Sequence, residues 1–108
     1  MDRGVTTMQF DDVICRREAG SAIVEGITQE WVWHSPAGFE WGYGGSGPAD
    51  LALNILLSAT GDRDFAAKNH QDFKWRFVAG LPAEGGVIAS NEVLDWIAQR
   101  QIETRVRM

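Results

Sequence analysis

The polar side chains best suited to chemistry lie in or beside one glycine-rich stretch, residues 34–57. They are His34, Ser35, Glu40, Tyr43 and Ser46. A hydrolytic site would need a serine nucleophile, a histidine base (His34 or His70) and a carboxylate to orient that base. Ser46 lacks the G-x-S-x-G context, however, and His34 and Ser35 are adjacent, which makes their direct pairing awkward. We therefore predict no catalytic residues, and we expect His34 and Glu40 to hydrogen-bond the loop backbone.

Anion binding is the second chemistry that this stretch suggests. Four glycines between residues 42 and 47 precede a predicted helix, and a helix N-terminus with free N–H groups can bind a phosphate. The ligand-binding residues of such a site would be His34, Tyr43, Gly44, Gly45 and Ser46. The stretch matches neither G-x-x-x-x-G-K-[ST] nor G-x-G-x-x-G, and no Lys or Arg lies between residues 17 and 63. The mismatch favours a tight turn into the helix, with anion binding as the alternative.

The chain offers little for a metal or a redox centre. Its two histidines, His34 and His70, lie far apart in sequence, and with Glu40 or Asp72 they form no ligand-spacing motif. The one cysteine, Cys15, lies in an apolar run and is expected to be a small core residue. We predict no metal site and no cofactor.

The helix that follows the glycines is the element around which we expect the domain to form. Pro48 fits its first helical position, and the pattern predicts a helix over residues 48–59. Asp50 would fall in the first turn, where a carboxylate is favourable against the helix dipole. Apolar residues cover the circumference except for a narrow stripe at Asp50, Asn54 and Ser58. A helix of this kind is buried on several sides.

The N-terminal part of the chain predicts a β-hairpin, from residues 10–17 and 22–28, with residues 29–33 as an imperfect third strand. Residues 1–9 predict a loose lead-in or an edge strand. A short added strand is expected at residues 87–89. Trp31, Trp33 and Trp41 are expected to pack in the core around the glycine-rich loop.

Two further helices are expected after the central one. The first covers residues 64–79, and Ala66, His70, Phe73 and Phe77 share one of its faces. Trp75 points nearly opposite; we expect another part of the chain to cover it, because Val78 lies on the same side, and an exposed interface anchor is the alternative. The last helix is expected from Ser90 or Asn91 to Gln101, with a frayed tail. Its buried residues should be Val93, Leu94, Trp96 and Ile97.

Length and charge limit the class of protein. The chain has 108 residues, a net charge of −5 and a pI near 4.8, which suit one acidic domain and argue against a nucleic-acid or anionic-membrane surface. It has no apolar signal core and no run long enough to span a membrane, so we expect a soluble, cytoplasmic protein. The fold predicted is one α+β domain over residues 1–108, a small N-terminal antiparallel sheet packed with about three helices.

Residues 34–53 read H-S-P-A-G-F-E-W-G-Y-G-G-S-G-P-A-D-L-A-L, and H-Q-D-F-K-W-R-F-V-A-G-L-P and E-V-L-D-W-I follow. Across residues 34–97 this pattern resembles a family of small bacterial and phage proteins of unknown function that share the core H-S-P-x-G-F-E-W-G-Y-G-G-S-G-P-A-x-L-A. The resemblance implies an α+β plan and a mobile-element origin. It brings no reaction, ligand or catalytic residue.

Two functions follow as hypotheses. The first is a non-enzymatic protein-binding module, a phage or mobile-element factor that inhibits a host defence complex. Trp75 or the N-terminal hairpin would supply its contact surface. The alternative is a small-ligand or anion-binding domain that uses the glycine-rich loop at the N-terminus of the central helix.

Overall fold

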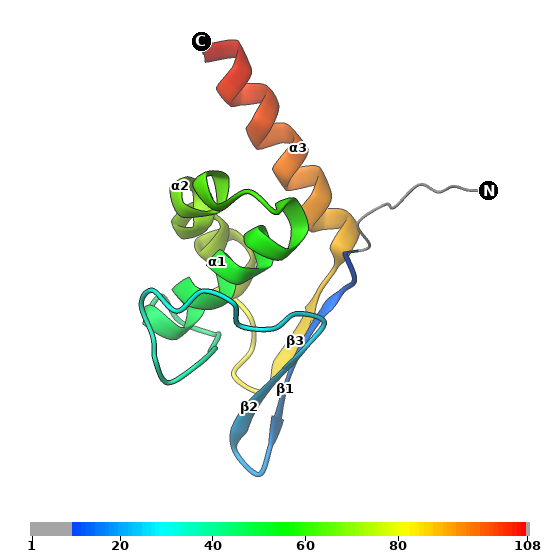
Figure 1. The fold of residues 1–108 in the computed structure, drawn as a ribbon. Coiled ribbons are helices and arrows are strands. Elements are labelled where there is room, and N and C mark those ends of the chain that lie inside the picture. The colour runs from blue at the N-terminus through cyan, green and yellow to red at the C-terminus, as the bar shows by residue number, and fades with distance from the viewer. Residues whose placement is uncertain (1–9, 108) are drawn as a thin grey trace, which may run out of the picture.

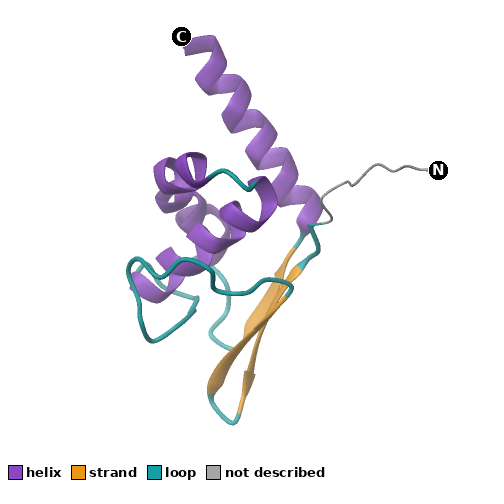
Figure 2. Cartoon of the chain, viewed as in Figure 1, coloured by secondary structure: helices purple, strands orange, loops and turns teal. Residues whose placement is uncertain are grey.

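The computed structural model describes residues 10–107, so the expectation for residues 1–9 lies outside the described part. A three-stranded antiparallel sheet packs with helices on one side, which confirms the α+β class (Figure 1). The elements are β1 (Val13–Glu18), β2 (Ser21–Glu25), α1 (Ser46–Thr60), α2 (Arg63–Phe73), η1 (Lys74–Val78), β3 (Gly85–Ile88) and α3 (Ser90–Arg107). Figure 2 shows α3 continuing beyond the other elements.

The strand order is β2-β1-β3, with both neighbours antiparallel to β1. The hairpin turn is Ala19–Gly20, and both residues have positive φ (51° and 83°), as a two-residue turn between twisted strands requires. The predicted hairpin is therefore confirmed, whereas the predicted third strand at residues 29–33 is wrong. The third strand of the sheet comes instead from β3, near the predicted residues 87–89.

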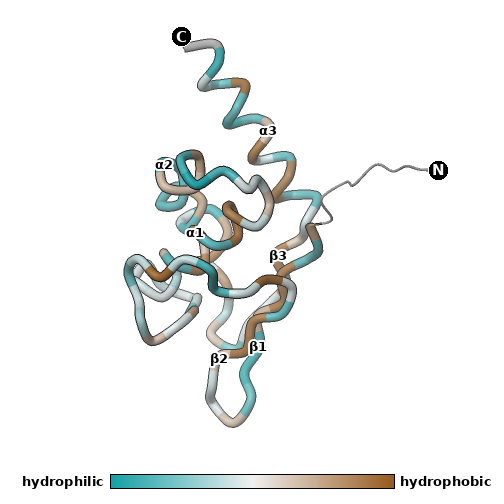
Figure 3. The backbone as a smooth tube through the Cα atoms, in the orientation of Figure 1, coloured by the Kyte–Doolittle hydropathy of each residue, from teal (hydrophilic) through white to brown (hydrophobic). Residues whose placement is uncertain are grey.

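Helix α1 is the buried centre of the molecule. Leu51, Leu53, Ile55 and Leu56 are fully buried, which confirms the expectation from the apolar pattern. The helix ends at Thr60, where Gly61 takes φ 67° and donates its N–H to the carbonyl of Leu57. Figure 3 shows hydrophobic stretches in α1 and in the strands, and mixed hydropathy along α3.

The start of α1 differs from the prediction. The N-cap is Gly45, so the helix begins at Ser46, and Pro48 occupies its third position rather than its first. A proline is tolerated there as well, because the first four N–H groups of a helix have no intrahelical acceptor. Asp50 consequently lies beyond the first turn, and its role is not to complement the helix dipole.

Helix α2 continues without a break into the π-helical turn η1. Asp62 caps α2 by accepting the N–H of Phe65 (3.0 Å). In η1 the N–H of Ala79 donates to the carbonyl of Lys74 (2.8 Å). The face predicted from Ala66, His70, Phe73 and Phe77 is buried, as expected.

The expectation that Trp75 is covered is wrong, because its side chain is 63% exposed. In a regular α-helix Trp75 and Val78 would project from nearly the same side. A π turn holds more residues, so it rotates Val78 away from Trp75 and into the core, where it is fully buried.

Helix α3 is longer than predicted, because residues 102–107, expected to fray, are helical. It packs through Val93 and Ile97, which are buried, and through Trp96, which lies edge-on to Phe73 at 5.2 Å between ring centroids. Leu94, expected in the core, is 45% exposed, because the position after Val93 turns about 100° away from the buried face. No helix within residues 10–107 has the length and apolar character needed to cross a membrane.

Candidate functional site at the glycine-rich loop

The polar stripe of α1 holds the chain segment that leads into the glycine-rich loop. Asn54 accepts the N–H groups of Glu30 (2.8 Å) and Trp31 (3.0 Å) and donates to the carbonyl of Trp31 (2.9 Å). Some backbone N–H and C=O groups of residues 29–33 therefore form hydrogen bonds with a helix side chain rather than with a neighbouring strand. The apolar periodicity of α1 predicts the polar stripe, but no local pattern predicts the backbone groups that Asn54 binds.

Asp50 is fully buried and continues the same anchoring one turn earlier. Its carboxylate accepts the N–H groups of Trp33 (3.2 Å), His34 (3.0 Å) and Ser35 (2.9 Å). Within residues 10–107 no cationic side chain forms an ion pair with it. Three backbone amides thus solvate the buried charge, and in return the charge fixes the backbone from which Trp33 and His34 project.

The two histidines, 36 residues apart in sequence, meet at this anchor. Their Nε2 atoms are 3.0 Å apart, and His70 Nδ1 lies 2.9 Å from the carbonyl oxygen of Ala67 and 3.1 Å from that of Ala66. A carbonyl can only accept, so Nδ1 of His70 carries its proton and Nε2 of His70 accepts from His34. Both ring nitrogens of His70 have partners, as expected for a core histidine.

Burial lowers the pKa of His70, and the nearby His34 acts in the same direction. The carbonyls of Ala67 and Ala66 and the carboxylate of Asp50 oppose that change. Trp33 shields the pair: its ring stacks on His34 at 4.7 Å and lies 5.1 Å from His70. Trp33 is itself half-exposed, unlike the buried Trp41, so the expectation of a core position is wrong for Trp33 and confirmed for Trp41.

The carboxylates considered for a metal site lie elsewhere. Glu40 pairs with Arg17 and Asp72 pairs with Arg100. Within residues 10–107 no group of three or more His, Cys, Asp or Glu side chains is placed to hold a metal ion. Cys15 is buried, and burial raises the pKa of its thiol to about 11, so the thiolate is disfavoured at neutral pH.

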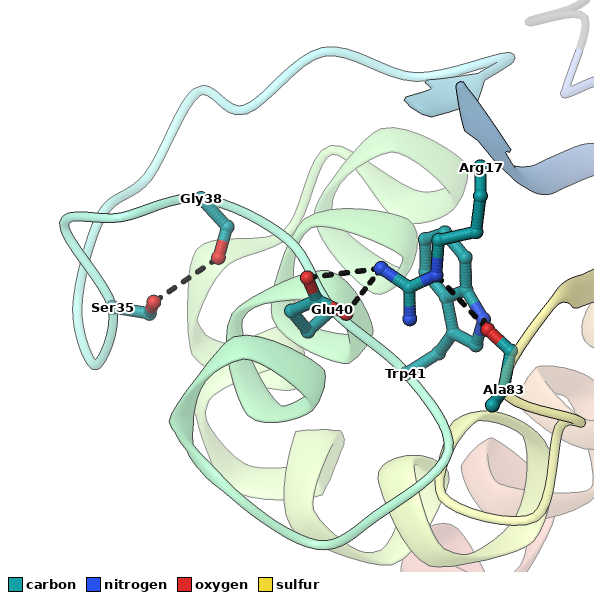
Figure 4. A network of polar contacts seen from close by, with 6 residues as sticks. All are labelled: Arg17, Ser35, Gly38, Glu40, Trp41 and Ala83. Atoms are coloured by element: carbon teal, nitrogen blue, oxygen red, sulfur yellow. Dashed lines mark hydrogen bonds and ion pairs between the residues drawn. The ribbon is translucent and has the colours of Figure 1, made fainter. Parts of the chain in front are cut away.

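The hydrolytic set is not assembled either. Ser35 is buried, and its hydroxyl donates to the carbonyl of Gly38 (3.1 Å; Figure 4). Ser46 is exposed at the first position of α1. Among the hydrogen bonds of residues 10–107, none joins a serine hydroxyl to His34 or His70, so the nucleophile–base contact is missing.

Arg17 ties the loop to the sheet and to the turn before β3 (Figure 4). Its guanidinium pairs with Glu40 (2.9 Å), donates to the carbonyl of Ala83 (3.0 Å) and lies 4.2 Å above the ring of Trp41. The indole N–H of Trp41 donates to the same carbonyl (3.1 Å). Glu40 therefore holds the loop through a side chain of β1 rather than through the loop backbone.

The glycines serve as contact points for aromatic rings. A side chain at Gly44 would overlap the ring of Trp75, and one at Gly45 would overlap the ring of Tyr43. Gly38 and Gly42, with φ 106° and 90°, need the left-handed region, whereas Gly44 does not have a positive φ. The exposed rings of Trp75 and Tyr43 thus lie against Gly44 and Gly45, two of the predicted ligand residues.

A cation reaches this loop from η1. Lys74 is only 6% exposed; its ammonium donates to the carbonyl of Gly44 (3.1 Å) and lies 4.4 Å from the centre of the Trp75 ring. Among the described residues it forms no ion pair with a carboxylate. The lack of basic residues between positions 17 and 63 therefore did not exclude a positive charge at the loop.

The geometry defines a small α+β protein in which aromatic, cationic and histidine side chains surround a glycine-rich loop. The chain belongs to a family of unknown function (DUF6166), whose model matches residues 3–99. No curated protein and no solved structure is significantly similar to it. Family membership thus assigns neither a reaction nor a ligand to the loop.

Asp50→Ala should lower the free energy of unfolding by at least about 3 kcal/mol, because it leaves three backbone N–H groups without their acceptor. Ser58→Ala is the matched control: it lies on the same stripe but is exposed, and it should change stability by no more than about 0.5 kcal/mol. Urea unfolding measures both. Equal stability of the two variants would contradict the anchoring role of Asp50.

His70 should make the protein less stable as the pH falls. Its pKa in the folded state lies below the value of about 6.5 in the unfolded chain, so the unfolded state binds more protons in this window. The contribution of His70 to the free energy of unfolding is therefore fully present above about pH 6.5 and is lost as the pH falls through the folded-state pKa of His70. The groups that face the ring are His34, Asp50, the two helix carbonyls and the amide of Gln71.

Urea unfolding at pH 7.5 and pH 5 checks this dependence against His70→Gln, which cannot titrate. The loss of stability between the two pH values should be larger for the wild type than for the variant. The same loss in both would show that His70 does not contribute.

Proposed function

We propose that this chain is a non-enzymatic protein-binding module whose contact surface is centred on Trp75 and Tyr43. The observation that carries the proposal is the exposure of these rings, 63% and 52%, over the neighbouring glycines Gly44 and Gly45. Large exposed aromatics are typical of the residues that dominate binding energy at protein interfaces.

Rigidity supports this assignment. The Trp75 ring packs against Gly44, which has no side chain, and the buried ammonium of Lys74 lies 4.4 Å from the centre of the ring. The backbone that carries the loop is in turn fixed through Asp50 and Asn54. A ring already held in place loses little conformational freedom on binding, which favours affinity.

The biological context that we propose is a phage or mobile-element factor that inhibits a host defence complex. It is supported by the resemblance of the core sequence in residues 34–53 and by the net charge of −5. A small acidic module would act by covering a surface of its target rather than by chemistry, in keeping with the unassembled hydrolytic set.

Trp75→Ala should weaken binding of the partner about 30-fold or more, the scale of a hot-spot residue. The partner would be captured by affinity purification from the native host and its affinity then measured by titration calorimetry. Ile102→Ser is the control, because Ile102 is exposed to a similar extent on α3. The proposal fails if the wild type retains no stoichiometric partner, or if Trp75→Ala binds it as tightly as the wild type.

Lys74 favours the second candidate, anion binding at the N-terminus of α1. A buried ammonium with three donors is bonded to one carbonyl, that of Gly44, and lies next to the uncapped start of the helix. The N–H groups of Ser46 and Gly47 belong to the first turn, which has no intrahelical acceptors. A phosphate group would find a charge and free amides at one place.

Inorganic phosphate and nucleotides should raise the melting temperature of the wild type if this second function is correct. Lys74→Met should abolish the shift, since it keeps the buried stem and removes the charge. Lys68→Met is the matched control on an exposed lysine of α2. No shift in the wild type, or the same shift in Lys74→Met, would dismiss the anion site.

A further inference from the structure

Strand β2 is an edge of the sheet, and its outward backbone groups can be assigned. The two-residue turn makes Glu18 and Ser21 the hydrogen-bonded pair that closes the hairpin. Because hydrogen-bonded and non-hydrogen-bonded pairs alternate in an antiparallel ladder, Ile23 faces β1. Ala22 and Val24 therefore direct their backbone N–H and C=O groups away from the sheet.

These outward groups are unpaired within residues 10–107: no hydrogen bond joins the backbone of Ala22 or Val24 to another segment beyond β1. Natural edge strands are commonly protected by a charged side chain, a proline or a bulge. Residues 22–24 of this edge are Ala, Ile and Val, and the charged residue at the end of β2, Glu25, is paired with Arg16 of β1. Such an edge is a template for another strand.

A groove of about 570 Å³ lies along this strand. It is lined by β2 and by the segments 27–29 and 37–40, which belong to the chain that leaves the end of β2 (Figure 1). Val24, Ile27 and Phe39 supply apolar surface, and Gln29 and Glu40 supply polar groups. Its volume falls within the range of about 300–1,000 Å³ that is usual for binding clefts.

Gln29 lines this groove and has an unpaired polar group. Its Nε2 is buried, and among the described residues it is the one buried side-chain nitrogen or oxygen without a hydrogen-bond partner. A donor left in this state costs free energy, so an acceptor supplied by a ligand or an ordered water would relieve that cost. The last side-chain torsion of glutamine is soft, so the amide can turn toward a carbonyl placed in the groove.

We propose that the free edge of β2 binds an extended peptide segment of another protein, which adds to the sheet as a fourth strand. The outward groups of Ala22 and Val24 are spaced by two residues, about 6.8 Å, which is the repeat of a peptide main chain in a strand. A segment of about five residues matches the length of β2. One of its carbonyls accepts from Gln29, and its alternate side chains are apolar, facing Val24 and Phe39.

The site is separate from the surface around Trp75, and the two can be tested independently. A peptide main chain fits better than a compact small molecule, because only an extended chain meets both outward residues and Gln29 at the same time. A second copy of this chain, pairing β2 with β2, is the competing occupant, and the experiment separates it.

The probe is a displayed library of random heptapeptides selected on the 108-residue chain. Synthetic copies of the enriched peptides are then titrated by fluorescence polarisation. Ala22→Pro should weaken their binding at least tenfold, because it removes an outward N–H but no bond of the β1–β2 ladder, a position at which proline is tolerated. Ile102→Ser, which changes an exposed residue of α3 outside both this groove and the Trp75 surface, should leave their affinity unchanged.

Gln29→Leu separates an effect on peptide binding from an effect on folding, because it should lower the affinity for the peptide without lowering the melting temperature. It should weaken peptide binding by a factor of about ten while leaving the melting temperature of the free protein unchanged or higher, because an unsatisfied donor is removed. Should Ala22→Pro not fold, amide hydrogen exchange replaces it: bound peptide should slow exchange at Ala22 and Val24.

Three results would overturn the proposal. They are the absence of enriched peptides, equal peptide affinity in the wild type and Gln29→Leu, and a dimer of the wild type in solution that Ala22→Pro dissociates. The last result would assign the edge to a second copy of the chain.

Discussion

The structure depends on a buried carboxylate that forms no ion pair with a cationic side chain of residues 10–107. Asp50 projects from the second turn of the core helix into a position where burial alone would make a charge prohibitively costly. The cost is offset because three consecutive amides, those of Trp33, His34 and Ser35, converge on it. Asn54 repeats the arrangement one turn along the helix. A segment that looks like a strand in sequence is thereby fastened to a helix.

The positions of the side chains at the loop depend on the hydrogen bonds that Asp50 and Asn54 form with this segment. With residues 33–35 held, His34 reaches His70 of α2, and Trp33 covers the pair. The chain then turns through the glycines, where the side chains of η1 complete the surface: Trp75 lies on Gly44, and Lys74 binds its carbonyl. The π turn is what makes this possible, since it directs Val78 into the core while Trp75 faces outward.

The two proposed binding surfaces differ in the physics by which they would recognise a partner. Around Trp75, recognition would rest on rigid aromatic area that is already desolvated on one side. Along β2, it would rest on main-chain hydrogen bonds, which are tolerant of sequence, and on an apolar groove that selects alternate side chains. A protein of 108 residues with both would be able to hold one partner at two points or two partners at once.

The sequence by itself determined the α+β class, the hairpin, the burial of α1 and the shared face of Ala66, His70, Phe73 and Phe77. These are local matters of turn chemistry and apolar periodicity, which are readable because each residue acts within its own element. Tertiary structure alone decided that residues 29–33 are not a strand, that Lys74 and Arg17 supply charge to the loop, and that Trp75 is exposed. For residues 29–33 and for Lys74, the deciding partner lies far away in the chain, 24 residues from Glu30 to Asn54 and 30 from Gly44 to Lys74, and no local pattern encodes which distant group will satisfy a backbone amide or carbonyl. For Trp75 the π turn decides, because it directs Val78 rather than Trp75 into the core.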